Sequence, residues 1–514
     1  MNSPAMNGQA ANGQAANGQA ANSGRAEPTP RAVGALKRYR LRKRHSKQRG
    51  VALIMVLGAL AVLTVMLTEF QTESTADLSS ALSHRDSIRA EYAAKSGLNL
   101  SRLLLASEPT IRKAAAPIFL LMGGRAFQIP VWEFADLVLG AFNDKESGKR
   151  FETLASVRLE EGENLGLDGA GFDIKIVDED SKINVNLPAK GDAFSQVRTG
   201  TAIATLISGP QYDALFENRD ADGQFTDRQA MCSALIDWTD PDQQAAVCLL
   251  GSDTAQTAAP EDSFYQQIGL KYVRKNAAFD SLEELRLVRG MSDDIWANFV
   301  EPDESDASKR TLTVWGQGEL NVNTANAQAL WTIICQYAVE NTPMCSEAEE
   351  AIKFISVVGV VKSYIAGVPL FNSPKGFINA MAGKGLFGAV FSTLGLQPVT
   401  FKSPNETMKA ISTESKVFNI AVRGYVKSAK RETNVRLRAV VDMRGAPEPA
   451  QAITDALGAL GVNIPGASSA GETAPEGNNP SAAPTSLPEG ATDSALANYF
   501  KPDPAGRIVY YRLE

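Results

Sequence analysis

The feature that most constrains how this 514-residue chain can fold is an uncharged apolar segment, Val51–Thr68, which directly follows a basic cluster. A helix of its 18 residues would be roughly 27 Å long, close to the hydrocarbon thickness of a bilayer. The first 50 residues hold ten Lys or Arg and one Glu. Because basic flanks stay in the cytoplasm, the sequence predicts a single-pass anchor with a cytoplasmic N-terminus and an exported body.

A cleaved secretory signal peptide is the alternative interpretation, since Ser74, Thr75 and Ala76 supply small residues after the apolar segment. The apolar cores of such peptides are usually shorter, about 7–15 residues. No proline occurs from Glu69 to Ala106, and apolar residues recur there at helical spacing. The pattern predicts one helix from Val51 to Ser107 that ends before Pro109. The residues that set this period are Leu78, Ala81, Leu82, Ile88, Tyr92, Leu98 and Leu103.

Charge and histidine content exclude several kinds of chemistry. Residues 7–22 repeat a small polar pentapeptide, so residues 1–50 are expected to be a disordered basic leader. The rest of the chain carries a net charge of −16, since it holds 41 of the 51 basic and 57 of the 58 acidic residues. Such a body repels nucleic acid but suits hard cations such as calcium. His45 and His84 are the only histidines, so histidine-dependent catalysis and His-ligated zinc are excluded downstream.

The hydrophobic period changes several times along the exported body. Residues 172–178 alternate as a strand, and 183–187 are predicted to be its hairpin partner. Residues 191–400 are mostly helical by pattern. Residues 417–426 and 433–441 predict a second hairpin, residues 446–493 are a linker rich in Pro, Gly, Ala and Ser, and 508–513 could form a last edge strand. A helical insertion into a small sheet is therefore expected.

Two acidic clusters are candidate metal ligands. The first contains Asp237, Asp240 and Asp242, and the second contains Glu261 and Asp262. Calcium takes six to eight hard oxygen ligands from such flexible carboxylates. Turns and helix caps are the simpler explanation of the same residues. A carboxylate pair that includes Asp240 would also suit an exported hydrolase, which we keep as a minor alternative.

A weaker metal candidate resembles the first half of an EF-hand loop. Asn218, Asp220 and Asp222 fall at loop positions one, three and five, and Gly223 falls at the turn. Gln229 stands where the bidentate Glu is required, which breaks the pattern, so a plain Asp-Gly turn is favoured.

Four cysteines predict two local disulfides in an oxidising compartment. Cys232 and Cys248 are 16 residues apart, and Cys335 and Cys345 are 10 apart. Four cysteines allow three connectivities, and buried free thiols remain an alternative.

Two further segments have competing interpretations. Residues 354–370 are apolar enough to suggest a second membrane span, but Lys362 lies within them, so a buried helix is favoured. Residues 281–299 could present a helix-hairpin-helix turn at Gly290 to DNA. Four acidic residues outnumber two arginines there, so a packing turn is favoured.

The basic leader ending in Gly50, the apolar segment beginning at Val51 and the long helix resemble the class III signal of type IV pilins and type II secretion pseudopilins. In that family a prepilin peptidase cuts after the glycine, so Gly50 and Val51 would flank the cut and the anchor from Val51 to Thr68 would remain attached. Most members have Glu at the fifth mature position, where this chain has Met55. That departure is typical of the K component, general secretion pathway protein K, and fits a subunit with no neighbour above it.

Ordered motifs in the body also resemble the K family. They are residues 237–242, 261–265, 281–296 and 320–330. The resemblance implies an α+β fold in which a long pilin-like N-terminal helix packs on a small antiparallel sheet, with a large all-α domain inserted between the β segments. The implied divisions are a leader at 1–50, the anchor helix at 51–107, pilin-like parts at 108–190 and 401–445, the insertion at 191–400, a linker at 446–495 and a C-terminal segment at 496–514.

The resemblance further implies a structural minor pseudopilin rather than an enzyme. It would sit in the bacterial inner membrane and at the tip of a periplasmic pseudopilus, where it caps or initiates assembly. The implied partners are the minor pseudopilins I and J, the major pseudopilin, the prepilin peptidase and the inner-membrane secretion platform, with no nucleic acid. Processing would be accompanied by methylation, and the inserted domain would bind calcium through the two acidic clusters. A type IV pilus-tip component and a DNA-uptake helix-hairpin-helix protein are the alternatives.

Overall fold

The computed structural model describes most of the chain from Arg49 onwards. The described residues are 49–121, 127–143, 149, 169–209, 212–217, 227–243, 245–246, 248, 265–266, 271–304, 306–365, 368–428, 431–447 and 503–514. The chain divides into two units, residues 1–76 and 77–514. The predicted leader and most of the predicted linker lie outside the described residues.

Helix α1 spans Arg49–Leu121 and continues through Pro109 and Pro117. The predicted end before Pro109 is therefore wrong. Proline removes a backbone donor and crowds the preceding turn, but tertiary contacts hold the helix on both sides of it. Before the proline, Glu108 accepts a hydrogen bond from the backbone N–H of Ile129 at 2.9 Å, and after it Arg112 Nη1 donates to Glu414 at 2.6 Å. These contacts override the local signal.

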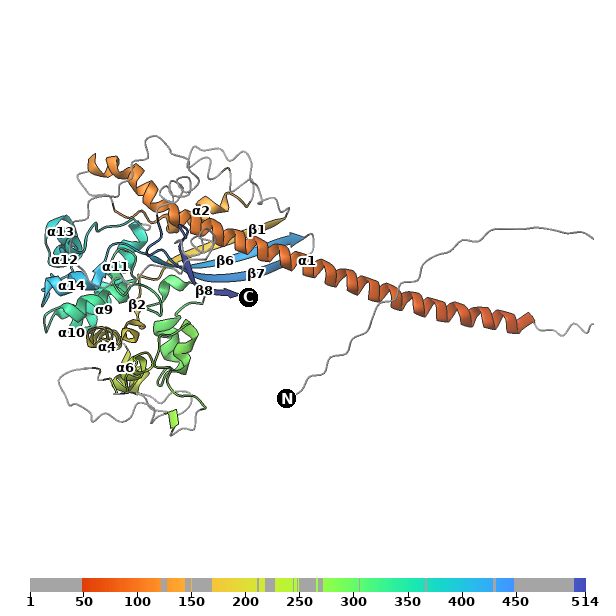
Figure 1. Cartoon of the computed structure of the whole chain (residues 1–514), viewed down its shortest axis with the longest axis horizontal. Coiled ribbons are helices and arrows are strands. Elements are labelled where there is room, and N and C mark those ends of the chain that lie inside the picture. Colours follow the sequence, from red (N-terminus) through yellow and green to blue (C-terminus); the bar gives the residue numbers. More distant parts are fainter. Residues whose placement is uncertain are drawn as a thin grey trace, which may run out of the picture. The chain divides into compact units, whose positions relative to one another are not determined.

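A four-stranded antiparallel sheet has the order β1-β6-β7-β8 (Figure 1). Its strands are β1 Ala170–Asp178, β6 Val417–Ser428, β7 Arg431–Asp442 and β8 Arg507–Leu513. Strands β6 and β7 form the expected hairpin, and β8 is the expected edge strand. The hairpin predicted between 172–178 and 183–187 is wrong, because β1 pairs with β6, which is distant in sequence.

Within the second unit, α1 crosses the sheet on a stripe of small residues. Its buried positions include Ala90, Ala94, Gly97 and Ser101. Of the residues that predicted the helical period, Leu98 is buried, whereas Leu78, Ile88, Tyr92 and Leu103 are exposed. The large apolar residues thus marked the helix correctly but not its packed face. Small side chains form that face because they let the helix backbone approach the strands closely. The short helices η1 Val131–Phe134 and α2 Ala135–Gly140 complete this core.

The segment between the β1 and β6 strands contains two helical lobes, each with its own hydrophobic core. The first lobe contains β2 Ile183–Asn184, η3 Leu187–Lys190, α4 Ala193–Ile207, α5 Asp213–Glu217, α6 Arg228–Asp237, η5 Leu282–Leu287, α8 Asp293–Ile295, η6 Trp296–Val300, η7 Ala307–Lys309 and β3 Leu312–Thr313. The second contains β4 Leu320–Asn321, α9 Ala327–Tyr337, α10 Pro343–Ser346, α11 Ala348–Ile365, α12 Pro374–Met381, α13 Gly385–Thr393, α14 Pro404–Ala410 and β5 Ile411–Ser412.

The expected all-α insertion at 191–400 needs correction, because it contains β3 and β4. Strand β3 pairs in parallel with β2, and β4 pairs in parallel with β5, so each short ladder closes one lobe on itself. Residues far apart in sequence supply the partners, which local periodicity cannot reveal. The starts of the helices, by contrast, follow from local sequence. Asp192, Asp227 and Asn326 each cap the N-terminus of a helix, because the side chain accepts a hydrogen bond from the backbone N–H three residues later.

Helix α11 occupies the region that could have been a second membrane span. Phe354 and Val358 are buried in the second core. Lys362 is half-buried and donates hydrogen bonds to the carbonyls of Asn323 and Ala325. Burial lowers the pKa of Lys362 to about 8. These contacts agree with the favoured interpretation of a core helix.

Candidate functional site

The apolar part of α1 is the first candidate site. It leaves Val51, Met55 and the intervening residues exposed, and across the described residues it lies in the one helix that is long and apolar enough to span a bilayer. Thr64 and Thr68 do not add unsatisfied polar groups, because each hydroxyl donates to a carbonyl one turn earlier, at 2.9 and 3.0 Å. A helix with an apolar surface and internally satisfied hydroxyls suits lipid or another apolar surface.

The predicted cleavage point lies at the start of this helix. Gly50 is exposed, and a Cβ placed on it would meet nothing within 4 Å. Helix packing therefore does not explain a glycine at this position. The residues before Arg49 lie outside the described part of the chain.

The structure brings Asp237, Asp240 and Asp242 together at the C-terminal end of helix α6. Asp237 Oδ1 accepts the backbone N–H of Ala246 at 2.6 Å. Gln196 Nε2 on α4 donates to Asp240 Oδ2 at 3.2 Å and to Asp242 Oδ2 at 3.3 Å. Asp240 is only 1% exposed, and its Oδ1 has no hydrogen-bond partner among the described residues.

The electrostatics of this cluster oppose ionisation. Burial, with the neighbouring Asp240, raises the pKa of Asp237 to about 7. Burial, with the charge of Asp242, raises the pKa of Asp240 to about 6, although Arg274 partly offsets both shifts. A cation would relieve this repulsion. Across the described residues, however, no group of three or more His, Cys, Asp or Glu side chains is arranged to hold a metal ion.

The other predicted metal ligands belong to segments outside the described residues. Glu261 and Asp262 lie outside the described residues, as do Asn218, Asp220 and Asp222 of the weaker candidate. The first acidic cluster is thus the part of the predicted site whose geometry is known.

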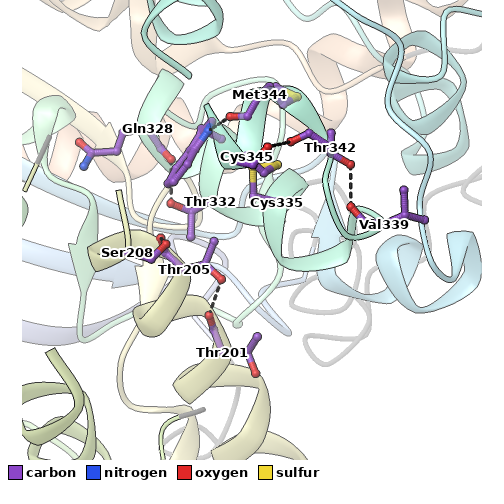
Figure 2. The surroundings of a disulfide bond; sticks show 12 residues. Thr201, Thr205, Ser208, Gln328, Thr332, Cys335, Val339, Thr342, Met344 and Cys345 are labelled. Atoms are coloured by element: carbon purple, nitrogen blue, oxygen red, sulfur yellow. Dashed lines mark hydrogen bonds between the residues drawn. A yellow bond between two sulfur atoms is a disulfide. The ribbon is translucent and has the colours of Figure 1, made fainter. Parts of the chain in front are cut away.

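Each helical lobe contains one disulfide bond. Cys232 and Cys248 are joined within the first lobe, and both are almost fully buried. Cys335 of α9 and Cys345 of α10 are joined in the second lobe and are half-buried. Figure 2 shows the second bond beside Met344, whose carbonyl accepts the Trp331 indole N–H at 2.7 Å.

The segment considered for DNA binding does not contain two regular α-helices. Residues 282–287 form the 3₁₀ helix η5, and α8 has only three residues. Leu285 and Phe299 are fully buried in the first core. Gly290 adopts a φ of +85°, which suits a tight turn. The segment therefore packs as the turn that was the favoured interpretation.

Sequence reasoning missed a buried polar cluster where β1 meets both lobes. The carboxylate of Asp178 accepts hydrogen bonds from the hydroxyls of Thr324 and Ser415. Glu179 forms a buried ion pair with Lys182 at 3.0 Å.

The carboxylate of neighbouring Asp180 accepts hydrogen bonds from the backbone N–H groups of Gln317 at 2.8 Å and Lys416 at 2.7 Å. The cluster thus joins the sheet to both lobes. The available signal was the run Asp178–Lys182, five polar residues between two apolar β segments.

One protein family model and one solved structure are similar to this chain. Residues 181–300 match the family model described as type II secretion system (T2SS), protein K. A search of curated proteins found no match. The chain is also similar to one in "The Crystal Structure of the GspK-GspI-GspJ complex from enterotoxigenic Escherichia coli Type 2 Secretion System", with 14% identity, a TM-score of 0.31, and coverage of 65% of this chain and 94% of that chain. Through the match over residues 181–300, the family predicted from the sequence motifs is confirmed: type II secretion system protein K.

Proposed function

We propose that this chain is a structural subunit at the tip of a periplasmic type II pseudopilus, where it caps or initiates assembly for protein export. The observation that carries the proposal is the match of residues 181–300 to secretion protein K in a chain that also has a long apolar N-terminal helix. Such a helix would anchor the chain in the inner membrane, with its N-terminus in the cytoplasm and its body in the periplasm.

The two parts of α1 support a role in a filament. The part from Val51 to Thr68 is apolar and exposed, while the part after Ala90 packs on the sheet. Leu78, Ile88 and Tyr92 are exposed on the same helix. An apolar surface of this kind is typical of a contact site. We assign it to neighbouring subunits, after a prepilin peptidase has cut between Gly50 and Val51 and the new terminus has been methylated.

The capping role rests on Met55 and on the inserted lobes. Met55 stands where most family members have the Glu that pairs with a neighbour's amine, so this subunit needs no neighbour above it. Two helical lobes on one sheet would also block further stacking. The motif resemblance implies assembly with pseudopilins I and J, the major pseudopilin and the inner-membrane platform.

We also assign calcium to the first acidic cluster. The observation that fits a cation is the buried Asp240 Oδ1, which has no hydrogen-bond partner among the described residues. Asp237 and Asp242 would supply further hard oxygens, and Glu261 and Asp262 would complete the set. Calcium would neutralise the mutual repulsion of these carboxylates and stiffen the loop after α6.

Immunogold labelling of pseudopili from cells that overproduce the major subunit tests the location. An antibody against the first lobe should label one end of each pseudopilus. Labelling along the length, or none, would contradict the tip assignment. Copurification should recover pseudopilins I and J, and recovery of type IV pilins instead would point to the related pilus.

A further inference from the structure

Helix α13, Gly385–Thr393, presents apolar side chains to solvent on one face. Leu386 is 78% exposed, and Val390 and Leu394 are each 43% exposed. They are spaced by four residues and therefore lie on the same face of the helix. A surface helix normally directs polar residues outward, so an apolar outer face indicates a contact with another apolar phase.

The inner face of α13 fixes its orientation. Phe391 is buried in the second core. A Cβ at Gly388 would collide with the backbone of Gly383, so the helix lies directly on that turn. Rotation of α13 to bury its outer residues would break these contacts. The exposed apolar face is therefore a stable feature of the fold.

The polar groups on this helix are already satisfied. Ser392 Oγ donates to the carbonyl of Gly388 at 2.9 Å, and Thr393 Oγ1 donates to that of Ala389 at 2.8 Å. The hydroxyls of the anchor segment of α1 are satisfied in the same way. Contact with hydrocarbon consequently leaves no side-chain hydroxyl unpaired, whereas a specific protein partner would normally use such groups for recognition.

The stretch of sequence that contains α13 is basic, whereas the body as a whole is acidic. From Ala351 to Asn405 the sequence contains five lysines and no acidic residue. Lys384 lies at the N-cap of α13, and Lys375 lies on α12, which packs beside α13 (Figure 1). Both are exposed, and neither forms an ion pair within the described part of the chain.

Glu350 and Glu406, the acidic residues at the two ends of this stretch, are already paired. Glu350 pairs with Lys353 at 3.3 Å, and Glu406 pairs with Lys409 at 3.0 Å. The free positive charge therefore lies at Lys375 and Lys384.

From this combination we propose that the α13 surface, defined by Leu386, Val390, Leu394, Lys375 and Lys384, binds the surface of an anionic phospholipid bilayer. The three apolar side chains enter the boundary between headgroups and acyl chains, and the two lysines meet the phosphates. This contact is separate from the α1 anchor, and it holds whether or not the chain caps a pseudopilus.

The test uses the full chain reconstituted in vesicles, with an environment-sensitive fluorophore on Ala389→Cys. Every native cysteine is in a disulfide, so the new thiol is the one that reacts. In vesicles of equal parts phosphatidylglycerol and phosphatidylcholine with brominated acyl chains, we expect a blue-shifted, quenched signal. In pure phosphatidylcholine the signal should remain that of a water-exposed probe. High salt should weaken the quenching.

Two variants separate the contributions. Leu386→Glu should lower the equilibrium constant for contact between the α13 surface and lipid roughly tenfold, which the loss of probe quenching measures, because one large apolar side chain is lost from the contact. Lys375→Gln with Lys384→Gln should remove the preference for anionic lipid. Val273→Glu is the matched control, because it makes a similar change at an exposed position of the first lobe, and it should have no effect. Melting curves should show that all variants stay folded.

Three outcomes would overturn the proposal. The probe could stay exposed to water in both vesicle types, or Leu386→Glu could leave the quenching unchanged. The probe could also become shielded only when purified pseudopilins are added, which would assign the α13 surface to a protein partner. None of these outcomes bears on the N-terminal processing or the tip location.

Discussion

Gly424 on β6 lies directly against the backbone of Ala90 on α1, so closely that a Cβ at Gly424 would collide with the Ala90 carbonyl oxygen. Gly97 makes the reciprocal approach from the helix, because a Cβ there would lie 2.8 Å from Val422. The backbone of the helix therefore lies very close to the sheet, along a seam of glycine and alanine residues. This seam holds the folded body onto the helix that carries the apolar segment.

Gly424→Ala should destabilise the folded body by roughly 1–3 kcal/mol or more, because α1 must move away from β6. Gly359→Ala is the matched control. Gly359 is exposed on α11, and a Cβ there would meet nothing within 4 Å, so Ala should stabilise that helix by up to about 1 kcal/mol. Urea unfolding measures both. Equal effects would show that the seam carries no strain.

Gly50→Leu should block maturation, so that mass spectrometry finds the precursor N-terminus instead of Val51. Gly58→Leu should leave processing intact. Both glycines lie in α1, and neither has an atom within 4 Å of the Cβ position, so folding does not distinguish them. Processing of both variants, or of neither, would argue against a peptidase that reads Gly50.

Calcium should raise the melting temperature of the wild-type chain, and Asp240→Asn should abolish that increase. Calcium at 100 times its dissociation constant would add about 2.7 kcal/mol of stability. Asp293→Asn, which neutralises an aspartate with a largely exposed side chain, is the control and should keep the response. Calcium stabilisation that survives in Asp240→Asn would place the ion elsewhere.

The stability of the buried polar cluster should depend on pH through Asp178. Burial, with the charge of Asp180, raises the pKa of Asp178 to about 7 in the folded protein, above its ordinary value of 3.8. The folded state then binds the proton more tightly than the unfolded state. The contribution of this group to stability is therefore complete below about pH 4 and is lost as the pH rises towards 7.

Asp178→Asn should flatten that part of the pH profile, since Asn cannot titrate and Thr324 and Ser415 can rotate their hydroxyls to accept from it. Urea unfolding at pH 5 and pH 8 measures the difference. Asp173→Asn, on the same strand but half-exposed, should retain the wild-type profile. A profile that Asp178→Asn leaves unchanged would contradict the assignment.

The two disulfides should differ in their access to reductant. Cys335 and Cys345 are half-buried, whereas Cys232 and Cys248 are buried in the first core. Under native conditions a mild reductant should therefore open the Cys335–Cys345 bond first, and mass spectrometry of alkylated peptides would show the order. Replacing both Cys232 and Cys248 with Ser should cost about 2–4 kcal/mol. Simultaneous reduction would indicate global unfolding instead.

Local patterns in the sequence were sufficient for several elements. The run Val51–Thr68 predicts a helix of bilayer length because charge and length are properties of the segment alone. The β6–β7 hairpin was predictable because its strands are adjacent and alternate regularly. The ordered motifs identified the family that the match over residues 181–300 confirms. Each of these conclusions depends on neighbours in sequence.

Tertiary structure alone decided where α1 packs, which strand β1 joins and which acids are buried. Pro109 lies within α1 because tertiary contacts of Glu108 and Arg112 hold the helix on either side. The polar residues from Asp178 to Lys182 resemble a solvated turn, yet partners more than a hundred residues away bury them. Burial and long-range pairing are properties of the assembled chain, so no local pattern encodes them. The same limit applies to the outer face of α13, whose exposure was known only once its core contacts were in place.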